Sequence, residues 1–258
     1  MSISSKLATI SQNMDRVFDK GRTKGYVEGY EKANSESNEA EWNKFWDRYQ
    51  DGGKRVKYGY AFYNPSKGWG IENFKPKYNI ICKGDASACF YAWEGLPNNV
   101  NFKDLIVDRG IKIDTSEATN MSNFMAYSTS IVGELPTISF ESAKANTAGA
   151  FHGVGVTKIE KVIVTADTNF DRFFQYCYNL EEVIIEGVIA KNGLNVSYSK
   201  NLNARSLESF VRALSTTTTG LTITFPRTAP NTFCAYHDQD SAWDDLIAQR
   251  ENWTFAYA

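Results

Sequence analysis

Residues 169–188 constrain the fold more than any other part of the sequence. This stretch reads NFDRFFQYCYNLEEVIIEGV: an aromatic run, a corner around Cys177 and Leu180, and then a short apolar strand with Val183 and Ile185. One such segment is too small to bury its own apolar side chains, so it must pack against similar segments. The stretch therefore predicts a stack of related units.

Looser copies of this unit precede it in the chain. Four units align on a phenylalanine, namely Phe90, Phe124, Phe151 and Phe174. Short strands are expected after them, at 111–113, 135–138, 162–164 and 183–185. A repeat of ~20–30 residues with one strand per unit is typical of leucine-rich repeats. We therefore expect residues 84–200 to form a short, irregular leucine-rich-repeat-like solenoid with one sheet, and a simple run of hairpins is the alternative.

Alternation along the expected strands separates inward from outward side chains. The outward positions form a possible binding face, which consists of Lys112, Asp114, Thr137, Ile163, Thr165, Ile184, Glu186, Thr222 and Thr224. Ile163 and Ile184 are expected to be neighbours on this open sheet. A stacked apolar pair can mark a contact patch, or it can be covered by a loop or by another subunit.

The first 33 residues favour a helix for assembly. Apolar residues step by three and four along a heptad seam, and the expected oligomer interface consists of Ile3, Leu7, Ile10, Met14, Val17, Gly21 and Gly25. We expect a short parallel coiled coil that makes a homo-oligomer, and the analogy with fibres favours a trimer. An amphipathic helix packed on its own domain is the alternative.

Two further regions complete an α+β fold. Residues 34–83 combine a polar break, an aromatic helix at 39–50 and an irregular Tyr- and Gly-rich segment at 54–77, where a carbohydrate platform is a minor alternative. Residues 201–258 predict a helix at 206–214, a strand at 221–225, a helix at 241–250 and a strand at 252–257. This last region suits the helical C-terminal cap that the end of a solenoid needs.

Charge and composition narrow the function. A formal net charge of −2 gives no electrostatic support for binding nucleic acid or anionic membranes. The N-terminal residues lack the apolar run of a secretory signal, and no apolar stretch of about 18 residues predicts membrane insertion. The four cysteines lack metal or disulfide spacing, so we expect synthesis in a reducing cytoplasm with free buried thiols.

Catalytic motifs are missing from the sequence, and we expect no enzymatic activity, no cofactor and no metal. There is no Gly-rich phosphate loop and no nucleophile elbow. His152 is expected to be a structural corner residue, and His237 with its neighbours Cys234, Asp238 and Asp240 matches no standard metal loop. A glycosidase pair of carboxylates stays open, because the sequence does not show which Asp and Glu residues converge.

The segment from Cys177 to Ile185, CYNLEEVII, resembles the BspA-type leucine-rich repeat. The wider layout resembles proteins encoded by phages and prophages of gut Firmicutes. It combines an MSIS-type start, KGRTKGYVEGY, FWDRYQDGG, YAFYNPSKGWGIENFKPKY, degenerate repeats and a tail ending in ENWTF. The first unit departs by inserting PNNVNFKD, and the second has Ser130-Ile131 in place of Asn-Leu.

The resemblance implies a non-enzymatic virion protein in a tail fibre, baseplate or other appendage. Such a protein is made in the bacterial cytoplasm and ends in the virion. Its expected partners are itself, other virion proteins, and a host-surface glycan or protein bound by the repeat surface. Two alternatives remain, namely a bacterial surface adhesin of the same repeat class and a purely structural virion joint without a receptor role.

Overall fold

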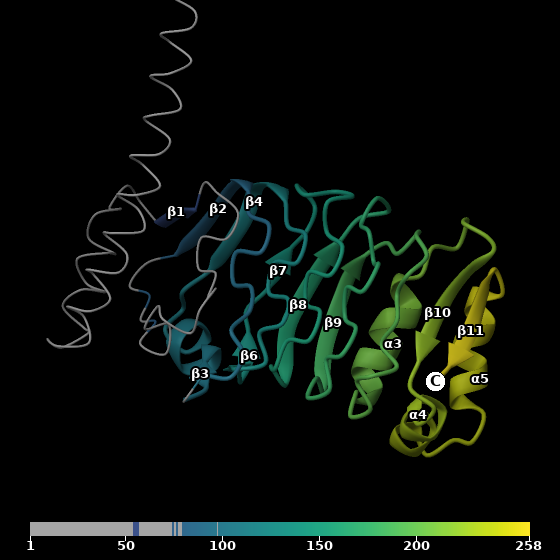
Figure 1. Ribbon diagram of the computed structural model, residues 1–258. Coiled ribbons are helices and arrows are strands. Elements are labelled where there is room, and N and C mark those ends of the chain that lie inside the picture. The colour runs from purple at the N-terminus through teal and green to yellow at the C-terminus, as the bar shows by residue number, and fades with distance from the viewer. Residues whose placement is uncertain (1–53, 57–73, 75, 77–78, 97) are drawn as a thin grey trace, which may run out of the picture.

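The computed structural model describes residues 54–56, 74, 76, 79–96 and 98–258, and these form an α+β fold. The expected oligomerisation helix over residues 1–33, the aromatic helix over 39–50 and most of the segment over 54–77 lie outside the described residues. The described elements line up in a row, which starts at β1 and ends at β11 (Figure 1).

Four small sheets are present in the part of the chain that the structure describes, and all of their pairings are parallel. Three of them are β1 (Lys54–Val56) with β2 (Ile80–Asp85) and β4 (Ile113–Asn120), β3 (Val100–Asn101) with β5 (Ile131–Val132), and β10 (Leu221–Phe225) with β11 (Trp253–Tyr257). The fourth joins β8 (Lys158–Val164) to β6 (Glu134–Leu135), β7 (Ile138–Ser139) and β9 (Glu182–Gly187). Parallel neighbours need a crossover between them, and the turns of each unit supply it.

The expectation of one sheet over residues 84–200 is wrong, because β4, the pair β3 and β5, and the group β6 to β9 belong to three separate sheets. The last of these sheets is also irregular. Where one strand was predicted at 135–138, Pro136 separates β6 from β7, because proline has no N–H to donate to a ladder. The register between β8 and β9 also shifts between Ile159 and Val162, which marks a bulge. The predicted strand at 111–113 gives way to β4, which begins at Ile113 and runs on to Asn120.

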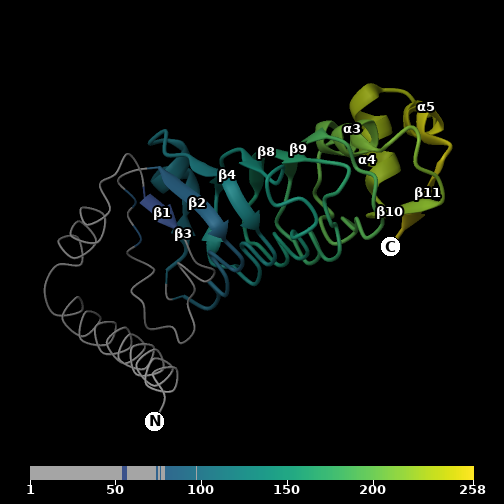
Figure 2. The same cartoon turned by 90° about the horizontal axis from the view of Figure 1, so that it is seen from above.

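A second ladder of main-chain hydrogen bonds runs along the turns, opposite the strands. Three N–H groups at equivalent positions donate to carbonyl oxygens of the next unit, namely Phe90 to Phe124 at 2.8 Å, Met125 to Ala150 at 2.7 Å and Phe151 to Phe173 at 2.9 Å. The same bonds recur two residues before and two residues after each of these donors. Figure 2 shows the strands along one side of the row and the turns along the other. Each unit is therefore held to the next on both sides.

Aromatic side chains fill the space between the two ladders. The four phenylalanines used for the sequence alignment are fully buried. The ladder shows, however, that Met125 and not Phe124 is the equivalent of Phe90 and Phe151. Phe151 contacts Phe140, Phe173 and Phe174 with ring centroids 5.5–5.6 Å apart, so one core supports both sides of the row.

The C-terminal region is helical around the sheet of β10 and β11. Helix α3 (Ala204–Ala213) begins two residues before the predicted start, because the Asn203 side chain accepts a hydrogen bond from the Ser206 N–H at 2.9 Å. Helix α5 (Ala242–Ile247) with the 3-10 turn η3 (Ala248–Arg250) matches the predicted helix at 241–250.

Two helical segments were not predicted. Helix α4 (Ala229–His237) buries only Ala229 and Phe233, so it lacks the apolar stripe by which sequence patterns reveal helices. The π-helix η2 (Lys103–Val107) begins in the inserted segment of the first unit. None of the described helices is long and apolar enough to cross a bilayer.

Candidate binding surface

The predicted binding face is spread over three sheets. Lys112 and Asp114 lie at the start of β4, and Thr222 and Thr224 lie in β10, beyond α3 (Figure 1). The other five positions belong to the four-stranded sheet or its ends, namely Thr137, Ile163, Thr165, Ile184 and Glu186. All nine side chains are exposed or half-buried. The structure therefore brings five of the nine together and leaves two pairs apart.

Polar groups on this sheet side are paired with one another. The register places Ile163 opposite Glu186, so Ile163 and Ile184 are not cross-strand partners. The Glu186 carboxylate lies 2.6 Å from Lys161 Nζ, and Thr137 donates to Glu160 from its N–H and its hydroxyl at 3.1 Å each. Ion pairing with Glu186 raises the pKa of Lys161. The expected apolar pair is therefore not formed, and its surroundings contain an ion pair and two hydrogen bonds.

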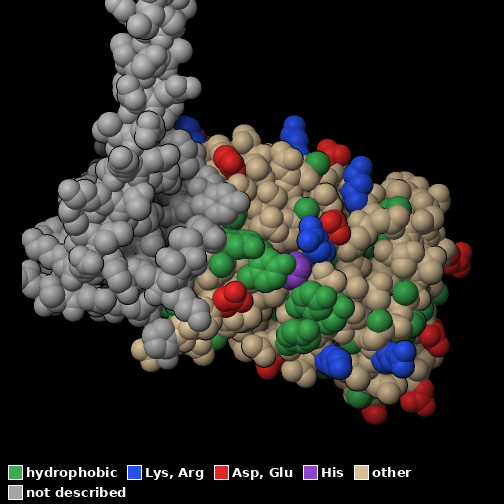
Figure 3. All heavy atoms as spheres, in the orientation of Figure 1, with side chains coloured by type: hydrophobic (Ala, Val, Ile, Leu, Met, Phe, Trp, Pro, Cys, Tyr) green, Lys and Arg blue, Asp and Glu red, His purple; other side chains and the backbone are tan. Residues whose placement is uncertain are grey.

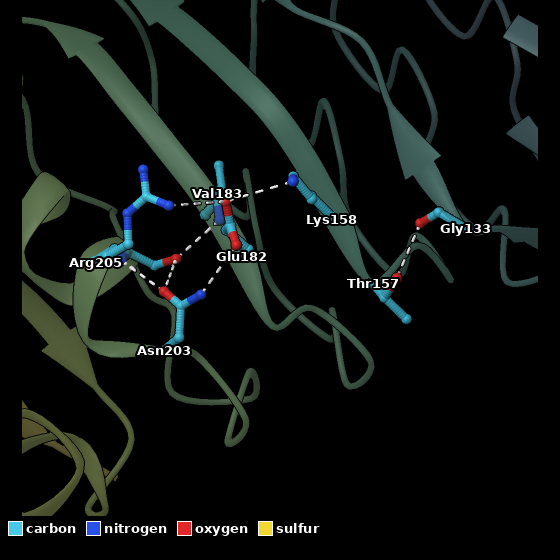
Figure 4. A network of polar contacts seen from close by, with 8 residues as sticks. Gly133, Thr157, Lys158, Glu182, Val183, Asn203 and Arg205 are labelled. Carbon is cyan, nitrogen blue, oxygen red and sulfur yellow. Dashed lines mark hydrogen bonds and ion pairs between the residues drawn. The ribbon is translucent and has the colours of Figure 1, made fainter. Parts of the chain in front are cut away.

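A polar network also joins this sheet to α3. The Glu182 carboxylate lies 3.6 Å from Lys158 Nζ and accepts a hydrogen bond from Asn203 Nδ2 at 3.2 Å (Figure 4). The hydroxyl of Ser206 accepts a hydrogen bond from the Val183 N–H at 2.9 Å. Glu182 thus links the N-terminal cap of α3 to β9. Its carboxylate already interacts with Lys158 and Asn203.

The turn side carries a continuous row of aromatic rings, here called the aromatic ridge, consisting of Tyr91, Tyr127, His152, Tyr176, Tyr178 and Tyr198. Centroid distances along the row are 5.4 Å from Tyr91 to Tyr127, 4.8 Å on to His152, 5.1 Å on to Tyr176 and 4.5 Å on to Tyr198. Tyr178 packs 6.0 Å from Tyr176 and 5.9 Å from Tyr198. Figure 3 shows hydrophobic side chains on both sides of a histidine near the middle of this face.

The ridge follows a regular pattern. Each of four units contributes one ring at a pair of ladder positions, and the pairs are Tyr91-Ala92, Ala126-Tyr127, His152-Gly153 and Gln175-Tyr176. The ring therefore alternates between the first and the second position from unit to unit. Small residues beside three of the four rings leave room for the ring of the neighbouring unit, so the rings interdigitate.

Two of the tyrosines sit in a backbone conformation that tyrosine disfavours. The second ladder position is left-handed in every unit, with φ of 61° at Ala92, 57° at Tyr127, 68° at Gly153 and 62° at Tyr176. Glycine adopts this region freely, but a residue with a Cβ pays roughly 1–2 kcal/mol. The rings of Tyr127 and Tyr176 are each 39% exposed, so full burial does not offset the strain. Strain of this kind clusters at functional sites.

His152 lies inside the ridge between Tyr127 and Tyr176. Its side chain is only 4% exposed, and its Nε2 atom has no hydrogen-bond partner among the described residues. Burial, and then the charge of Arg172, lower the pKa of His152 from its ordinary 6.5, so the ring is neutral at pH 7. A buried polar atom without a partner destabilises the fold by about 1–3 kcal/mol.

The other residues singled out from the sequence serve packing. Cys177 is fully buried and its thiol donates to the Phe151 carbonyl oxygen at 3.0 Å, while burial raises the pKa of the thiol to about 12. His237 is exposed at the end of α4 and packs on Phe233 at 4.4 Å. Among the described residues no group of three or more His, Cys, Asp and Glu side chains is placed to hold a metal ion.

Comparison with known proteins identifies no relative. No protein-family model matches the chain, and neither a curated protein nor a solved structure matches it. The geometry of the two sides is therefore the basis for assigning a function.

The sequence did carry a signal for the ridge. In three of the four units one aromatic ring stands beside a small residue, as in Tyr91-Ala92, Ala126-Tyr127 and His152-Gly153. In the fourth unit Tyr176 stands directly before the buried corner residue Cys177. The pattern does not show when the units are aligned on their buried phenylalanines, because Phe124 is one residue out of register with Phe90 and Phe151. His152, which was expected to be a structural corner residue, is buried, and nothing in the sequence shows that it lies between two exposed tyrosines.

Proposed function

We propose that the protein is a non-enzymatic adhesion protein of a phage virion appendage, such as a tail fibre or baseplate, which binds the host surface through its repeat region. The aromatic ridge carries this proposal. Exposed tyrosines are common in recognition surfaces, and two of these hold a strained backbone conformation. These features distinguish the ridge from the sheet side, where polar groups pair with one another.

The described part is, in this proposal, a short irregular solenoid similar to leucine-rich repeats. Parallel pairing throughout and main-chain ladders on both sides support this view. Hydrogen bonds from side chains link residues 22 to 38 positions apart along the chain, as expected when each unit contacts the next. A stack of this kind presents a long, rigid surface, which suits recognition of an extended partner.

Assembly through residues 1–33 is part of the same proposal, and a homotrimer gives three ridges on one particle. Several weak sites then act together through avidity. Sedimentation of the full chain and of a Leu7→Asp/Met14→Asp variant tests this part. We expect a trimer that the double substitution converts to a monomer, because both residues lie in the heptad seam. A monomeric wild-type chain contradicts it.

Immunogold electron microscopy tests the placement. Antibodies against the protein are applied to phage particles released from cells that carry the gene, and adsorption to host cells is measured with and without antibody. We expect label on an appendage and reduced adsorption. Label on the cell envelope alone identifies a bacterial adhesin instead, and label on the particle without any effect on adsorption identifies a structural joint.

A further inference from the structure

We propose that the aromatic ridge binds a neutral oligosaccharide, along the row of rings from Tyr91 to Tyr198. This inference rests on the proposed adhesion function and names the chemical class of its ligand. The ridge offers flat apolar ring faces bordered by hydroxyl groups. A sugar ring has the matching character, with apolar C–H faces bordered by hydroxyls, so the exposed tyrosines Tyr127, Tyr176 and Tyr178 can stack on sugars and exchange hydrogen bonds at their rims.

Charge on the ridge favours a neutral ligand. None of the six ridge side chains is charged at pH 7, because the pKa of His152 is lowered by burial. The nearest charges that act on His152 are Arg172 and Asp171, which are exposed and lie 3.6 Å apart as an ion pair. Opposite charges side by side provide little steering for a charged ligand.

The backbone of the ridge is not free for an extended peptide. Peptides that bind by strand addition use unpaired N–H and C=O groups at a sheet edge. Here the Tyr127 N–H donates to the His152 carbonyl oxygen at 2.7 Å, and the Gly153 N–H donates to the Gln175 carbonyl oxygen at 2.8 Å. Recognition on this side therefore depends on side chains, and the exposed ones are Tyr127, Tyr176 and Tyr178. The side chain of Tyr176 also shares a hydrogen bond with Tyr198.

The unpartnered Nε2 atom of His152 points to the same ligand class. A ligand that turns the ring of Tyr127 or Tyr176 aside uncovers this atom, and a sugar hydroxyl then supplies the hydrogen bond that the protein lacks. An apolar ligand leaves Nε2 unpaired, so a hydroxyl-bearing ligand is favoured. The row of rings across successive units fits a chain of several sugars better than a single one.

Binding of the full-length protein to an array of immobilised neutral and anionic glycans tests the inference. The ridge variants are Tyr127→Gly and Tyr176→Gly, in which glycine keeps the left-handed backbone. The matched control is Tyr236→Ala, which removes an exposed tyrosine from α4, away from the ridge. We expect binding to neutral oligosaccharides, a loss of roughly tenfold for each ridge variant, and no loss for the control.

His152→Phe separates the polar atom from the ring. Phenylalanine keeps the ring contacts and removes the unpartnered nitrogen, so glycan binding falls while the urea midpoint does not. Unchanged binding by His152→Phe overturns the role given to Nε2. Binding to no glycan, binding to anionic glycans only, or equal binding by wild type and both tyrosine variants overturns the ligand assignment. If the protein binds no glycan on the array, but antibodies label a phage appendage and reduce adsorption, this inference is wrong and the proposed function stands.

Discussion

The sheet side and the turn side of the same row of units are built by different rules. On the sheet side, no residue of the described strands other than glycine has a positive φ, and surface charges pair with one another, as Lys161 does with Glu186. On the turn side, Tyr127 holds a strained backbone with its ring 39% exposed, and His152 buries an unpartnered nitrogen. These features of the sheet side are all expected of a surface that only stabilises the fold. The turn side retains features that reduce stability, which makes it the better candidate for a binding surface.

The largest effect should come from the core that both sides share. Phe151→Ala removes a fully buried ring that contacts Phe140, Phe173 and Phe174, and we expect the free energy of unfolding to fall by about 3–5 kcal/mol. Urea denaturation followed by circular dichroism measures it. A loss below 1 kcal/mol would show that the two sides do not rest on one core.

The second-largest loss in the free energy of unfolding should come from a position on the turn side where neighbouring units lie very close together. A Cβ atom at Gly155 would overlap the carbonyl oxygen of Thr129 in the preceding unit. We therefore expect Gly155→Ala to lower the free energy of unfolding by about 1–3 kcal/mol. Gly220→Ala is the control for steric overlap, because nothing lies within 4 Å of the Cβ position at Gly220. The φ of 73° at Gly220 adds backbone strain to this control but no overlap. If Gly155→Ala is as stable as wild type, the units lie farther apart than described.

Glycine and alanine should rank in opposite order on the two sides. At position 127 the left-handed backbone makes Tyr127→Gly more stable than Tyr127→Ala by roughly 1 kcal/mol. At position 163, within β8, Ile163→Gly should be less stable than Ile163→Ala by about 0.5–1 kcal/mol. Chemical denaturation of the four variants gives both differences. The same order at both positions would remove the contrast between the sides.

The smallest effect concerns pH. Because burial lowers the pKa of His152 below 6.5, the unfolded state binds more protons just below that pH, and stability should fall as the pH drops from about 7.5 to about 5. His152→Phe should lack this part of the slope. The charges of Asp171 and Arg172, which also affect the pKa of His152, are present in both proteins. Identical pH slopes for wild type and variant would contradict the buried, neutral histidine.

Sequence reasoning reached the parts of the fold that periodicity encodes. The alternating strand at 221–225 and the helix around Phe210 are both found, and β8 and β9 contain the predicted strands at 162–164 and 183–185. The division into four sheets was missed, because strand pairing is set by register between units and not by the alternation within one strand. The break at Pro136 and the shift between β8 and β9 interrupt one of these sheets from within. Helix α4 was missed for lack of an apolar stripe.

The candidate site was less predictable than the fold. Outward residues on strands follow from alternation, and all nine are indeed exposed or half-buried. The aromatic ridge follows from left-handed corners that bring Tyr91, Tyr127, His152 and Tyr176 into one row. Glycine signals such a corner at Gly153, whereas the alanine and the two tyrosines at the other three positions do not. A pattern of contacts across four units cannot be read from one unit at a time.

The central claim is that the ridge tyrosines are kept for binding and not for folding. The most direct test is the urea midpoint of the Tyr127→Gly/Tyr176→Gly double variant against that of wild type. Relief of backbone strain offsets the lost ring contacts, so the account predicts a midpoint equal to or above that of wild type. A clearly lower midpoint would contradict it, because the two rings would then stabilise the fold.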